Sequence, residues 1–378
     1  MTQAEALTIL KTGGNVFLTG EPGAGKTYVI NKYVDYLRAR GVEPAITAST
    51  GIAATHIGGM TIHSWSGLGV KTRITDYDLD KIAGSEYVVK RLRRAKVLII
   101  DEVSMLSADT LTSVEAICRT VRQSGEAFGG LQIVLVGDFF QLPPVVRRDE
   151  GTVVSRFAYT SPVWARAKFL VCYLTEQYRQ DDERLLAVLS AIRNNNFSRE
   201  HLGYLEGRRV EQANLQNGST KLFSHNLDVD RVNEEMLNRL PGAARLFIMN
   251  SRGREAVVAA LKKGCLSPES LQLKVGAVVM FTKNSLSGGF VNGTLGVVES
   301  FSNLSRQPLV RTRQERLIEV APLDWTVEDN GRVLGEISQL PLRLAWAITV
   351  HKSQGMSLDE AVIDLSQVFE FGQGYVAL

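Results

Sequence analysis

The chain has 378 residues, of which 44% are hydrophobic and 22% are charged, and its formal net charge is +3. This length suits two or three globular domains with large buried cores. No apolar run reaches the ~18–20 residues of a membrane span, and the N-terminus lacks the basic start of a signal peptide, so we expect no membrane partner. The three cysteines (Cys118, Cys172 and Cys265) lie too far apart for a disulfide framework or a metal cluster, which indicates a soluble protein of a reducing compartment.

Apolar runs alternate with helical patterns along the first half of the chain. The run at residues 15–20 ends in glycine and leads into a helical pattern at 26–41. Further apolar runs lie at 44–50, 96–101 and 131–138, with another helical pattern at 107–125. Buried strands that alternate with helices indicate a doubly wound parallel sheet. We expect this first α/β domain to span residues 1–175.

Residues 66–90 interrupt this alternation and are interpreted as a small insertion. Between Lys71 and Lys96 the chain has eight Lys or Arg and four Asp or Glu, a local excess of +4. Such a basic block can attract a polyanion, and it can equally be an ordinary solvated helix face. Charge alone leaves both interpretations open.

A second α/β pattern starts near residue 169. Helical patterns at 182–195 and 228–240 flank the apolar run at 220–226, and a buried-strand pattern returns at 361–366. Between them, residues 271–340 form short runs separated by Gly and Asn turns, which is typical of a small β barrel. We therefore predict a second α/β domain from residues 176–270 and 341–378, with the β module inserted at 271–340.

The stretch "GEPGAGKT" at residues 20–27 follows a strand and opens a helix, as the phosphate-binding loop of P-loop proteins does. Its glycines let backbone N–H groups curl around phosphates at the positive end of the helix. Lys26 would contact the β- and γ-phosphates, and the Thr27 hydroxyl would bind Mg²⁺. The residues expected to bind the nucleotide in this loop are Gly20, Gly23, Ala24, Gly25, Lys26 and Thr27.

Two acids follow the apolar run "VLII". Asp101 at the end of a strand can reach Mg²⁺ through water, and Glu102 can orient or deprotonate an attacking water. This pair favours nucleotide hydrolysis, although two surface acids capping a strand are the alternative. After the third strand, Gln141 in "FFQLPPV" could sense the γ-phosphate, while Pro143 and Pro144 stiffen the turn.

Seven blocks of this sequence, taken in order, resemble Pif-type helicases, which are RecD-like motors of helicase superfamily one. They are "GEPGAGKT", "TASTGIAA", "GMTIHSW", "IIDEVSML", "AFGGLQIVLVGDFFQLPPV", "TEQYRQ" and "LAWAITVHKSQGMSLD". The resemblance covers nearly the whole chain. It implies two RecA-like P-loop NTPase domains with ATP and Mg²⁺ between them, a small wedge insertion at about 66–90 and an SH3-like β barrel at 271–340. It further implies 5′-to-3′ movement along single-stranded DNA.

The resemblance also implies roles for particular residues. Gln3 would read the adenine, Gly355 would lie at the nucleotide, and Arg179 would act as an arginine finger, a task that suits a guanidinium because it stays charged. DNA contacts would come from hydroxyls, backbone N–H groups and cations that hold phosphates without reading sequence. Those residues are Thr50, Gly51, His63, Thr349, His351 and Lys352. Trp65 could stack on a base, worth ~1–3 kcal/mol, or simply pack in the core.

The chain departs from the family pattern at "GQGYVAL". In the family this segment continues into Ser-Arg, and that arginine makes a second contact with the γ-phosphate. A stop in mid-motif is typical of a cut chain, and the alternative is a form with impaired hydrolysis. Loss of such an arginine lowers the rate by ~10³–10⁵ in related ATPases. We thus expect ATP binding more firmly than hydrolysis.

The leading hypothesis is an ATP-dependent 5′-to-3′ DNA helicase that acts on single-stranded DNA and on DNA with a 5′ tail, with G-quadruplexes as a further substrate. It implies work in DNA repair, recombination and telomere maintenance, as a monomer or as a dimer on DNA. Two alternatives remain: an ATP-gated DNA-binding module with impaired hydrolysis, and a RecD-like subunit of a larger complex. The short N-terminus favours a bacterial cytoplasm or a phage-infected cell; in a eukaryote we expect a nuclear or mitochondrial protein.

Overall fold

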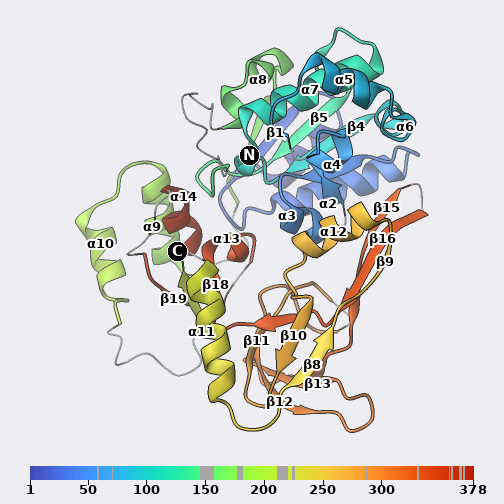
Figure 1. Cartoon of the computed structure of the whole chain (residues 1–378). Helices are drawn as coiled ribbons and strands as arrows, with labels where there is room; N and C mark the ends of the chain where they lie inside the picture. The colour runs from blue at the N-terminus through green and yellow to red at the C-terminus, as the bar shows by residue number, and fades with distance from the viewer. Residues whose placement is uncertain are drawn as a thin grey trace. The chain divides into compact units, whose positions relative to one another are not determined.

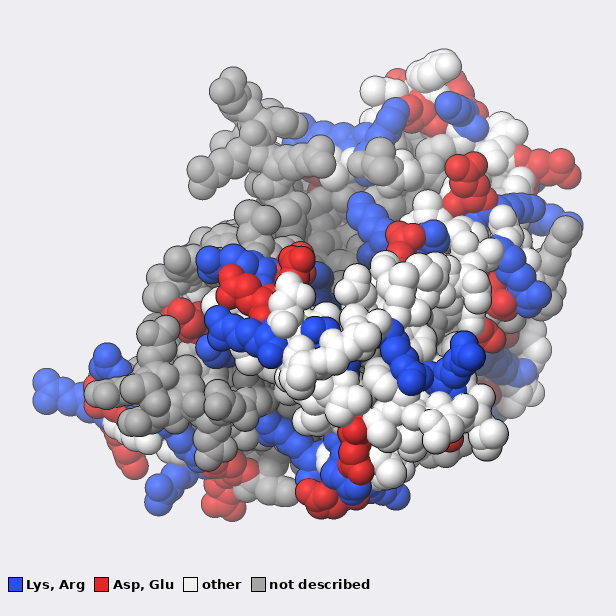
Figure 2. All heavy atoms as spheres, turned by 60° about the horizontal axis from the view of Figure 1, so that its bottom comes forward, with Lys and Arg blue, Asp and Glu red and all other residues white. Residues whose placement is uncertain are grey.

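The computed structural model describes residues 1–57, 59–69, 71–144, 157–176, 182–210, 220–223, 226–285, 288–329, 332–356, 358, 361–365, 368 and 371–378. The chain divides into two compact units, Met1–Asp182 and Glu183–Leu378 (Figure 1). Among the described residues, no helix is long and apolar enough to cross a membrane. On the face shown in Figure 2, positive and negative side chains are interspersed around uncharged surface, as the small net charge would suggest.

The first unit is built on a six-stranded parallel sheet with the order β3-β2-β4-β5-β1-β6. In chain order its strands are β1 (Val16–Gly20), β2 (Ala45–Ala48), β3 (Met60–Thr61), β4 (Val97–Asp101), β5 (Gln132–Val136) and β6 (Leu170–Leu174). The three central strands β4, β5 and β1 are almost entirely buried, because helices cover both faces of the sheet. The predicted parallel α/β core is therefore confirmed.

Alternate residues of the central strands enter two separate hydrophobic cores. Val16 and Leu18 pack with α1 (Gln3–Leu10) and α2 (Lys26–Arg38) on one face. Phe17 joins the core on the other face. That second core also receives residues from α4 (Ile62–Ser66), α6 (Glu86–Arg94), α7 (Ala108–Arg122) and α8 (Pro162–Ala167). The period-two alternation of strands thus produces the doubly wound arrangement.

The segment between β3 and β4 forms short helices, in the region where the sequence predicts an insertion. After α4 come α5 (Asp76–Ala83) and α6, and α3 (Gly51–His56) lies before β3. Val88 and Leu92 of α6 are buried in the core of the first unit. Arg91 of the same helix is only 8% exposed. The basic block at Lys71–Lys96 is therefore not a uniformly solvated face.

The second unit contains a three-stranded parallel sheet with the order β18-β7-β19. Its strands are β7 (Thr220–Phe223), β18 (Ala347–Thr349) and β19 (Ala361–Ile363). The helices of this part are α9 (Glu183–Arg193), α10 (Arg199–Glu206), α11 (Asn226–Arg239), α13 (Val350–Ser353) and α14 (Phe371–Ala377). The Asn233 side chain of α11 fastens that helix to β18, since it donates to the Ala347 carbonyl (2.9 Å) and accepts from the Ala347 N–H (3.0 Å).

The rest of the second unit is mostly antiparallel β structure. A five-stranded sheet with the order β14-β13-β12-β11-β17 is made of β11 (Val278–Phe281), β12 (Leu295–Phe301), β13 (Pro308–Thr312), β14 (Leu317–Glu319) and β17 (Leu342–Leu344). A three-stranded sheet joins β15 (Leu323–Asp329), β16 (Arg332–Gln339) and β9 (Asn250–Gly253). A third sheet pairs β8 (Arg245–Ile248) with β10 (Ser270–Leu273), and α12 (Glu255–Gly264) packs against β16. Antiparallel pairing thus begins with β8, earlier than residue 271, where the sequence predicts that the β module starts.

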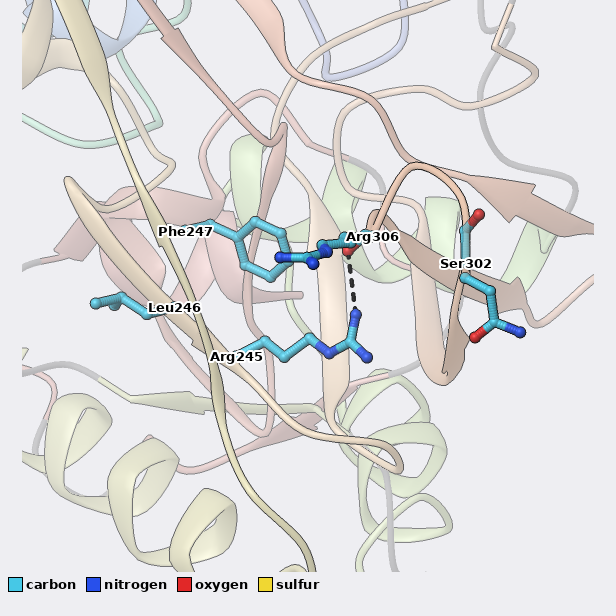
Figure 3. Close-up of a pocket in the computed structure, with 6 residues that line it drawn as sticks. Arg245, Leu246, Phe247, Ser302 and Arg306 are labelled. Carbon is cyan, nitrogen blue, oxygen red and sulfur yellow. Dashed lines mark hydrogen bonds between the residues drawn. The ribbon is translucent and has the colours of Figure 1, made fainter.

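A surface pocket lies on this β-rich part, between β8 and the turn after β12 (Figure 3). It is lined by Arg245, Leu246, Phe247, Ser302, Asn303 and Arg306. The Arg245 guanidinium lies 4.3 Å from the centre of the Phe301 ring and donates to the Arg306 carbonyl at 3.5 Å. None of the residues that the sequence predicts for nucleotide or DNA binding lines this pocket.

Candidate nucleotide and nucleic-acid site

The predicted nucleotide residues of the first unit meet at one edge of its sheet. β1, β5 and β4 are neighbouring parallel strands, so their carboxyl ends lie side by side. Gly20 ends β1 and Asp101 ends β4, while Gln141 follows β5 by a short turn. In open α/β sheets, ligands bind at this carboxyl edge. The sheet therefore gathers groups that are more than a hundred residues apart in sequence.

The loop between β1 and α2 needs its glycines. Gly20, Gly23 and Gly25 have φ values of 152°, 88° and 84°, a region that L side chains rarely adopt. A Cβ at Gly20 would lie 2.8 Å from the Leu174 carbonyl oxygen, and one at Gly25 would lie 2.0 Å from Nε2 of Gln3. The loop is thus a tight backbone cradle that leads directly into a thirteen-residue helix.

Gln3 lies against this cradle, at the start of α1. Its side-chain amide donates to the Ala24 carbonyl at 3.2 Å, and its backbone N–H donates to the Glu176 carboxylate at 3.1 Å. Thr2 caps α1 in a capping box with Glu5, which fixes the entry of the helix. The position beside the loop is compatible with the predicted contact to a base, which stays a prediction.

Lys26 is the first residue of α2, and its ammonium lies inside the loop. It donates to the carbonyl oxygens of Gly20 (2.9 Å) and Glu21 (3.1 Å). Gly25 at the N-cap offers no side-chain acceptor to the first turn of α2. Backbone N–H groups of a first turn without such a cap can bind an anion, and the helix dipole favours negative charge there.

The two acids at the end of β4 have distinct environments. Burial raises the pKa of Asp101, while the hydrogen bond from the Glu102 N–H (2.8 Å) and the Lys26 ammonium lower it. Glu102 has φ 52°, a left-handed conformation that costs about 1–2 kcal/mol for a residue with a side chain. Its carbonyl accepts from the Ser49 hydroxyl at 2.7 Å, which helps to hold that conformation. Strained backbone of this kind collects at functional sites.

The donor set at this edge fits a nucleotide triphosphate with Mg²⁺. Thr27 supplies a hydroxyl and Asp101 a carboxylate, and hard oxygen ligands together with phosphate oxygens are what Mg²⁺ prefers. At Gly20 and Gly25 a Cβ would collide with Leu174 or with Gln3, so no side chain covers the loop backbone at these two positions. Among the described residues no group of three or more His, Cys, Asp or Glu could hold a metal ion.

The third strand end contributes Gln141. Its backbone N–H donates to the Asp138 carbonyl at 3.0 Å, and the Asp138 carboxylate accepts from the Phe140 N–H at 3.2 Å. These bonds form a compact turn directly after β5. The side chain of Gln141 is partly buried at the same sheet edge as Asp101. Its contact with a γ-phosphate remains a prediction.

The predicted DNA residues of the first unit take different positions. Thr50 precedes α3, where its hydroxyl accepts from the Ala53 N–H at 3.2 Å, and Gly51 opens that helix. His63 is partly buried in α4, and burial lowers its pKa, so the ring is neutral at pH 7. Trp65 is only 3% exposed and belongs to the hydrophobic core. Of the two interpretations of Trp65, its placement supports packing, because a buried indole has no face free for a base.

The predicted residues of the second unit surround α13. Thr349 is 2% exposed, and its hydroxyl caps the helix by accepting from the Lys352 N–H at 3.3 Å. His351 and Lys352 are partly buried in α13, and Gly355 is exposed with φ 76° just after it. Burial lowers the pKa of Lys352, as does the nearby Arg343 cation, while Asp230 raises it. Arg179 lies outside the described residues.

Two arginines that the sequence did not single out lie beside these residues. Arg91 of α6 donates to the Ser64 carbonyl at 2.9 Å and also to the Trp65 carbonyl, so it holds the end of α4. Arg343 of β17 is a buried neighbour of Lys352. Nothing in the local sequence marks either one, because both act on residues brought near by folding.

Comparison with known proteins places the chain. Residues 2–208 match the family described as PIF1-like helicase, and residues 258–301 match the 2B domain of DNA helicase Pif1. This chain belongs to the PIF1-like helicase family. It is 41% identical to the ATP-dependent DNA helicase Pif1 of Psychrobacter sp. (strain PRwf-1), over the whole of this chain and 66% of that protein. It is 39% identical to the human ATP-dependent DNA helicase PIF1, over the whole of this chain and 58% of that protein.

Solved structures agree with this PIF1-like membership. The Pif1 of Bacteroides sp in complex with ADP-AlF4 matches with a TM-score of 0.85 and 31% identity, over 99% of this chain and 88% of that one. The Bacteroides Pif1 bound to single-stranded DNA matches with a TM-score of 0.65 and 32% identity, over 100% and 88%. These matches confirm the predicted fold class of two RecA-like domains with a β-barrel insertion. The chain spans about three fifths to two thirds of several of the curated relatives, including the Psychrobacter and human proteins.

Proposed function

We propose that this PIF1-like chain carries the motor of an ATP-dependent DNA helicase that moves 5′ to 3′ along single-stranded DNA and separates duplexes. The observation that carries the proposal is the cluster at the carboxyl edge of the first sheet. There Lys26 lies inside a glycine cradle, within electrostatic range of the partly buried Asp101. Relatives named ATP-dependent DNA helicases support the same activity.

The residues of this edge divide the work of nucleotide hydrolysis. N–H groups of the loop from Gly20 to Gly25 hold the phosphates, and Lys26 neutralises the β- and γ-phosphates. Thr27 and Asp101 would hold a magnesium ion, which would neutralise charge on the phosphate oxygens. Glu102 orients the attacking water and Gln141 responds to the γ-phosphate. Gln3 contacts the base, Gly355 approaches the nucleotide, and Arg179, outside the described residues, serves as the arginine finger.

Contacts with DNA are proposed from both units. In the first unit they come from Thr50, Gly51 and His63, and in the second from Thr349, His351 and Lys352. The hydroxyls of Thr50 and Thr349 cap short helices, so these residues set the backbone that meets a phosphate. A solved relative is described as bound to single-stranded DNA, which supports this class of ligand. Cations and N–H groups that grip phosphates do not read sequence, so binding depends on backbone charge.

The finer assignments extend this proposal. We include G-quadruplexes and 5′-tailed DNA among the substrates, and monomeric action with dimers on DNA. The cellular work proposed is DNA repair, recombination and telomere maintenance. The proposed location is the bacterial cytoplasm or a phage-infected cell, or the nucleus or mitochondrion of a eukaryotic host.

The test compares unwinding of a 5′-tailed duplex with that of a 3′-tailed duplex, along with ATPase activity with and without oligothymidine. We expect unwinding of the 5′-tailed substrate and ATPase stimulated by the oligonucleotide. Lys26→Ala should abolish both, because the phosphates lose their cation. Lys32→Ala is the matched control, since Lys32 lies exposed on the same helix. Equal unwinding of 3′-tailed DNA would contradict the polarity, and ATP binding without stimulated hydrolysis would favour an ATP-gated binding module.

A further inference from the structure

Arg343 is a buried cation that has no hydrogen-bond or ion-pair partner in the described part of the chain. It lies in β17 opposite Met280 of β11, and it is 8% exposed. Among the residues that the structure describes, its guanidinium makes no hydrogen bond or ion pair, and its Nε is fully buried. The terminal nitrogens are not among its fully buried unpaired atoms, so the small exposure of the side chain includes them. The guanidinium therefore keeps a narrow opening at its donor end.

An unpaired buried guanidinium is unfavourable by itself. Arginine stays protonated in proteins, so it cannot escape the desolvation penalty by losing its charge. Burial lowers the pKa of Arg343, which records that penalty. Buried polar groups in native proteins are nearly always hydrogen-bonded, and each exception requires an explanation. A ligand that supplies negative charge is one such explanation.

A second cation, Lys352, lies within electrostatic range of Arg343. The positive charge of Arg343 contributes to the lowered pKa of Lys352 in α13. The Lys352 ammonium likewise has no hydrogen bond or ion pair within the described parts of the chain; only its backbone N–H is bonded, to Thr349. The folded chain thus brings the charge of Arg343 in β17 within electrostatic range of Lys352 in α13.

One carboxylate faces this pair. Asp230 of α11 raises the pKa of both cations, yet it forms no ion pair with either one in the described structure. The bonds between Asn233 and Ala347 fix α11, and Asn233 lies one helical turn after Asp230, so the two share a face. The charge of the three groups sums to +1. An anion therefore remains electrostatically favoured at this position.

We propose that Arg343 and Lys352 together bind one backbone phosphate of a nucleic-acid strand. Arginine binds phosphate oxygens through two parallel N–H donors, and lysine adds a point charge. This inference rests on the proposed function, to which it adds a residue, Arg343, that neither the motif pattern nor any relative's name assigns. Arg343 gives the second unit a buried donor in addition to the partly buried Lys352.

The test measures the affinity for a short oligothymidine by fluorescence anisotropy at several salt concentrations. Arg343→Met should weaken binding about tenfold, since it removes a charge-assisted hydrogen bond. The slope of log K against log salt should fall by about 0.7, the value for one phosphate contact on a single strand. Arg343→Lys should keep most of the slope. Arg252→Met, which removes an exposed arginine on β9, is the control and should match the wild type.

Two further measurements separate binding from a structural role. Arg343→Met should raise the melting temperature of the free protein by about 2–4 °C, because an apolar side chain replaces an unpaired buried charge. Asp230→Asn should tighten oligothymidine binding, because it removes a negative charge beside the phosphate. A structural arginine would instead lower the melting temperature when replaced and leave the salt slope unchanged.

The outcomes distinguish this site from the proposed function. If the wild type binds oligothymidine and Arg343→Met binds it equally well with an equal slope, the phosphate site is refuted and the helicase proposal stands. If the wild type does not bind oligothymidine, both fail. A third outcome is that the substitution leaves oligothymidine affinity unchanged, while inorganic phosphate at matched ionic strength raises the melting temperature of the wild type and not that of Arg343→Met. In that case the site binds free phosphate, and its assignment to nucleic acid is refuted.

Discussion

Replacing Arg91 should loosen the helix that carries His63. The Arg91 guanidinium is 8% exposed and donates to the carbonyl oxygens of Ser64 and Trp65, in the last turn of α4. α4 has only five residues, so these bonds supply much of what holds its end. Arg91→Met keeps the length of the side chain and removes both donors. It also removes the hydrogen bond from Arg91 to the Met60 sulfur (3.7 Å) and the cation–π contact with the Tyr87 ring (5.0 Å), so it tests the polar contacts of Arg91 together.

The magnitude follows from the number of bonds. A hydrogen bond from a charged donor is worth about 1.5–3 kcal/mol, and two are lost. Part of this is offset, because the variant no longer has to desolvate a buried cation. We expect a net loss of about 2–4 kcal/mol in the free energy of unfolding, against a usual total of about 5–15 kcal/mol. The first unit should still fold, with α4 less well held.

The assay is urea unfolding followed by tryptophan fluorescence, together with oligothymidine binding. At a slope of about 1–3 kcal/mol per molar urea, the midpoint should fall by about 1–2 M. Oligothymidine affinity should fall as well, since His63 moves, while nucleotide affinity should stay unchanged. Lys90→Met is the control, because Lys90 is exposed on the same helix and its substitution also removes one positive charge. Equal midpoints for the two variants would refute the anchoring role, and equal losses of DNA affinity would show that charge alone matters.

Three more predictions test single features of the first unit. Gly20→Ala should weaken nucleotide binding at least about tenfold, because its Cβ would lie 2.8 Å from the Leu174 carbonyl oxygen. Gly125→Ala is the control and should leave the affinity unchanged, because its Cβ would have nothing within 4 Å. The assay is binding of a fluorescent ATP analogue, and unchanged affinity of Gly20→Ala would refute the role of the loop in nucleotide binding. Trp65→Phe should destabilise the protein by about 1–3 kcal/mol and leave oligothymidine affinity unaltered; the reverse pattern would revive base stacking. Because burial lowers the pKa of His63 below 6.5, the unfolded chain takes up its proton first, so stability should decline as pH falls through about 6.5 and level off below the folded pKa. His63→Gln should flatten this profile in urea titrations, and an identical profile would refute it.

The sequence predicted those parts of the site that depend on short-range chemistry. The loop from Gly20 to Thr27 is contiguous, and its glycines are required by local backbone angles that the structure confirms. Asp101 and Glu102 follow an apolar run, so their place at a strand end could be read from pattern alone. The neighbouring position of these groups also followed from the sequence, because parallel strands present their carboxyl ends at one edge.

The sequence could not predict which face of a helix or strand is buried where the element is too short to show a hydrophobic period. Trp65 belongs to a five-residue helix, too short for periodicity to tell a core face from an exposed one, and the fold puts it in the core. The sequence of the basic block gives its net charge but does not show which of its side chains are buried, and in the structure the Arg91 side chain is buried. The strands β8 and β9 lie before residue 271, the predicted start of the β module, because their pairing partners are distant in sequence and no local pattern shows them.

Sequence by itself determined the chemistry available to this protein, namely a phosphate cradle, an acid pair and a parallel sheet to hold them. Only the tertiary structure decided which charged side chains are buried and which groups they meet there. Arg91 meets backbone carbonyls 26 and 27 residues away, and Arg343 is enclosed beside Lys352 with no hydrogen bond among the described residues. Desolvation depends on everything that packs around a group, and that is a property of the folded chain and not of any stretch of it.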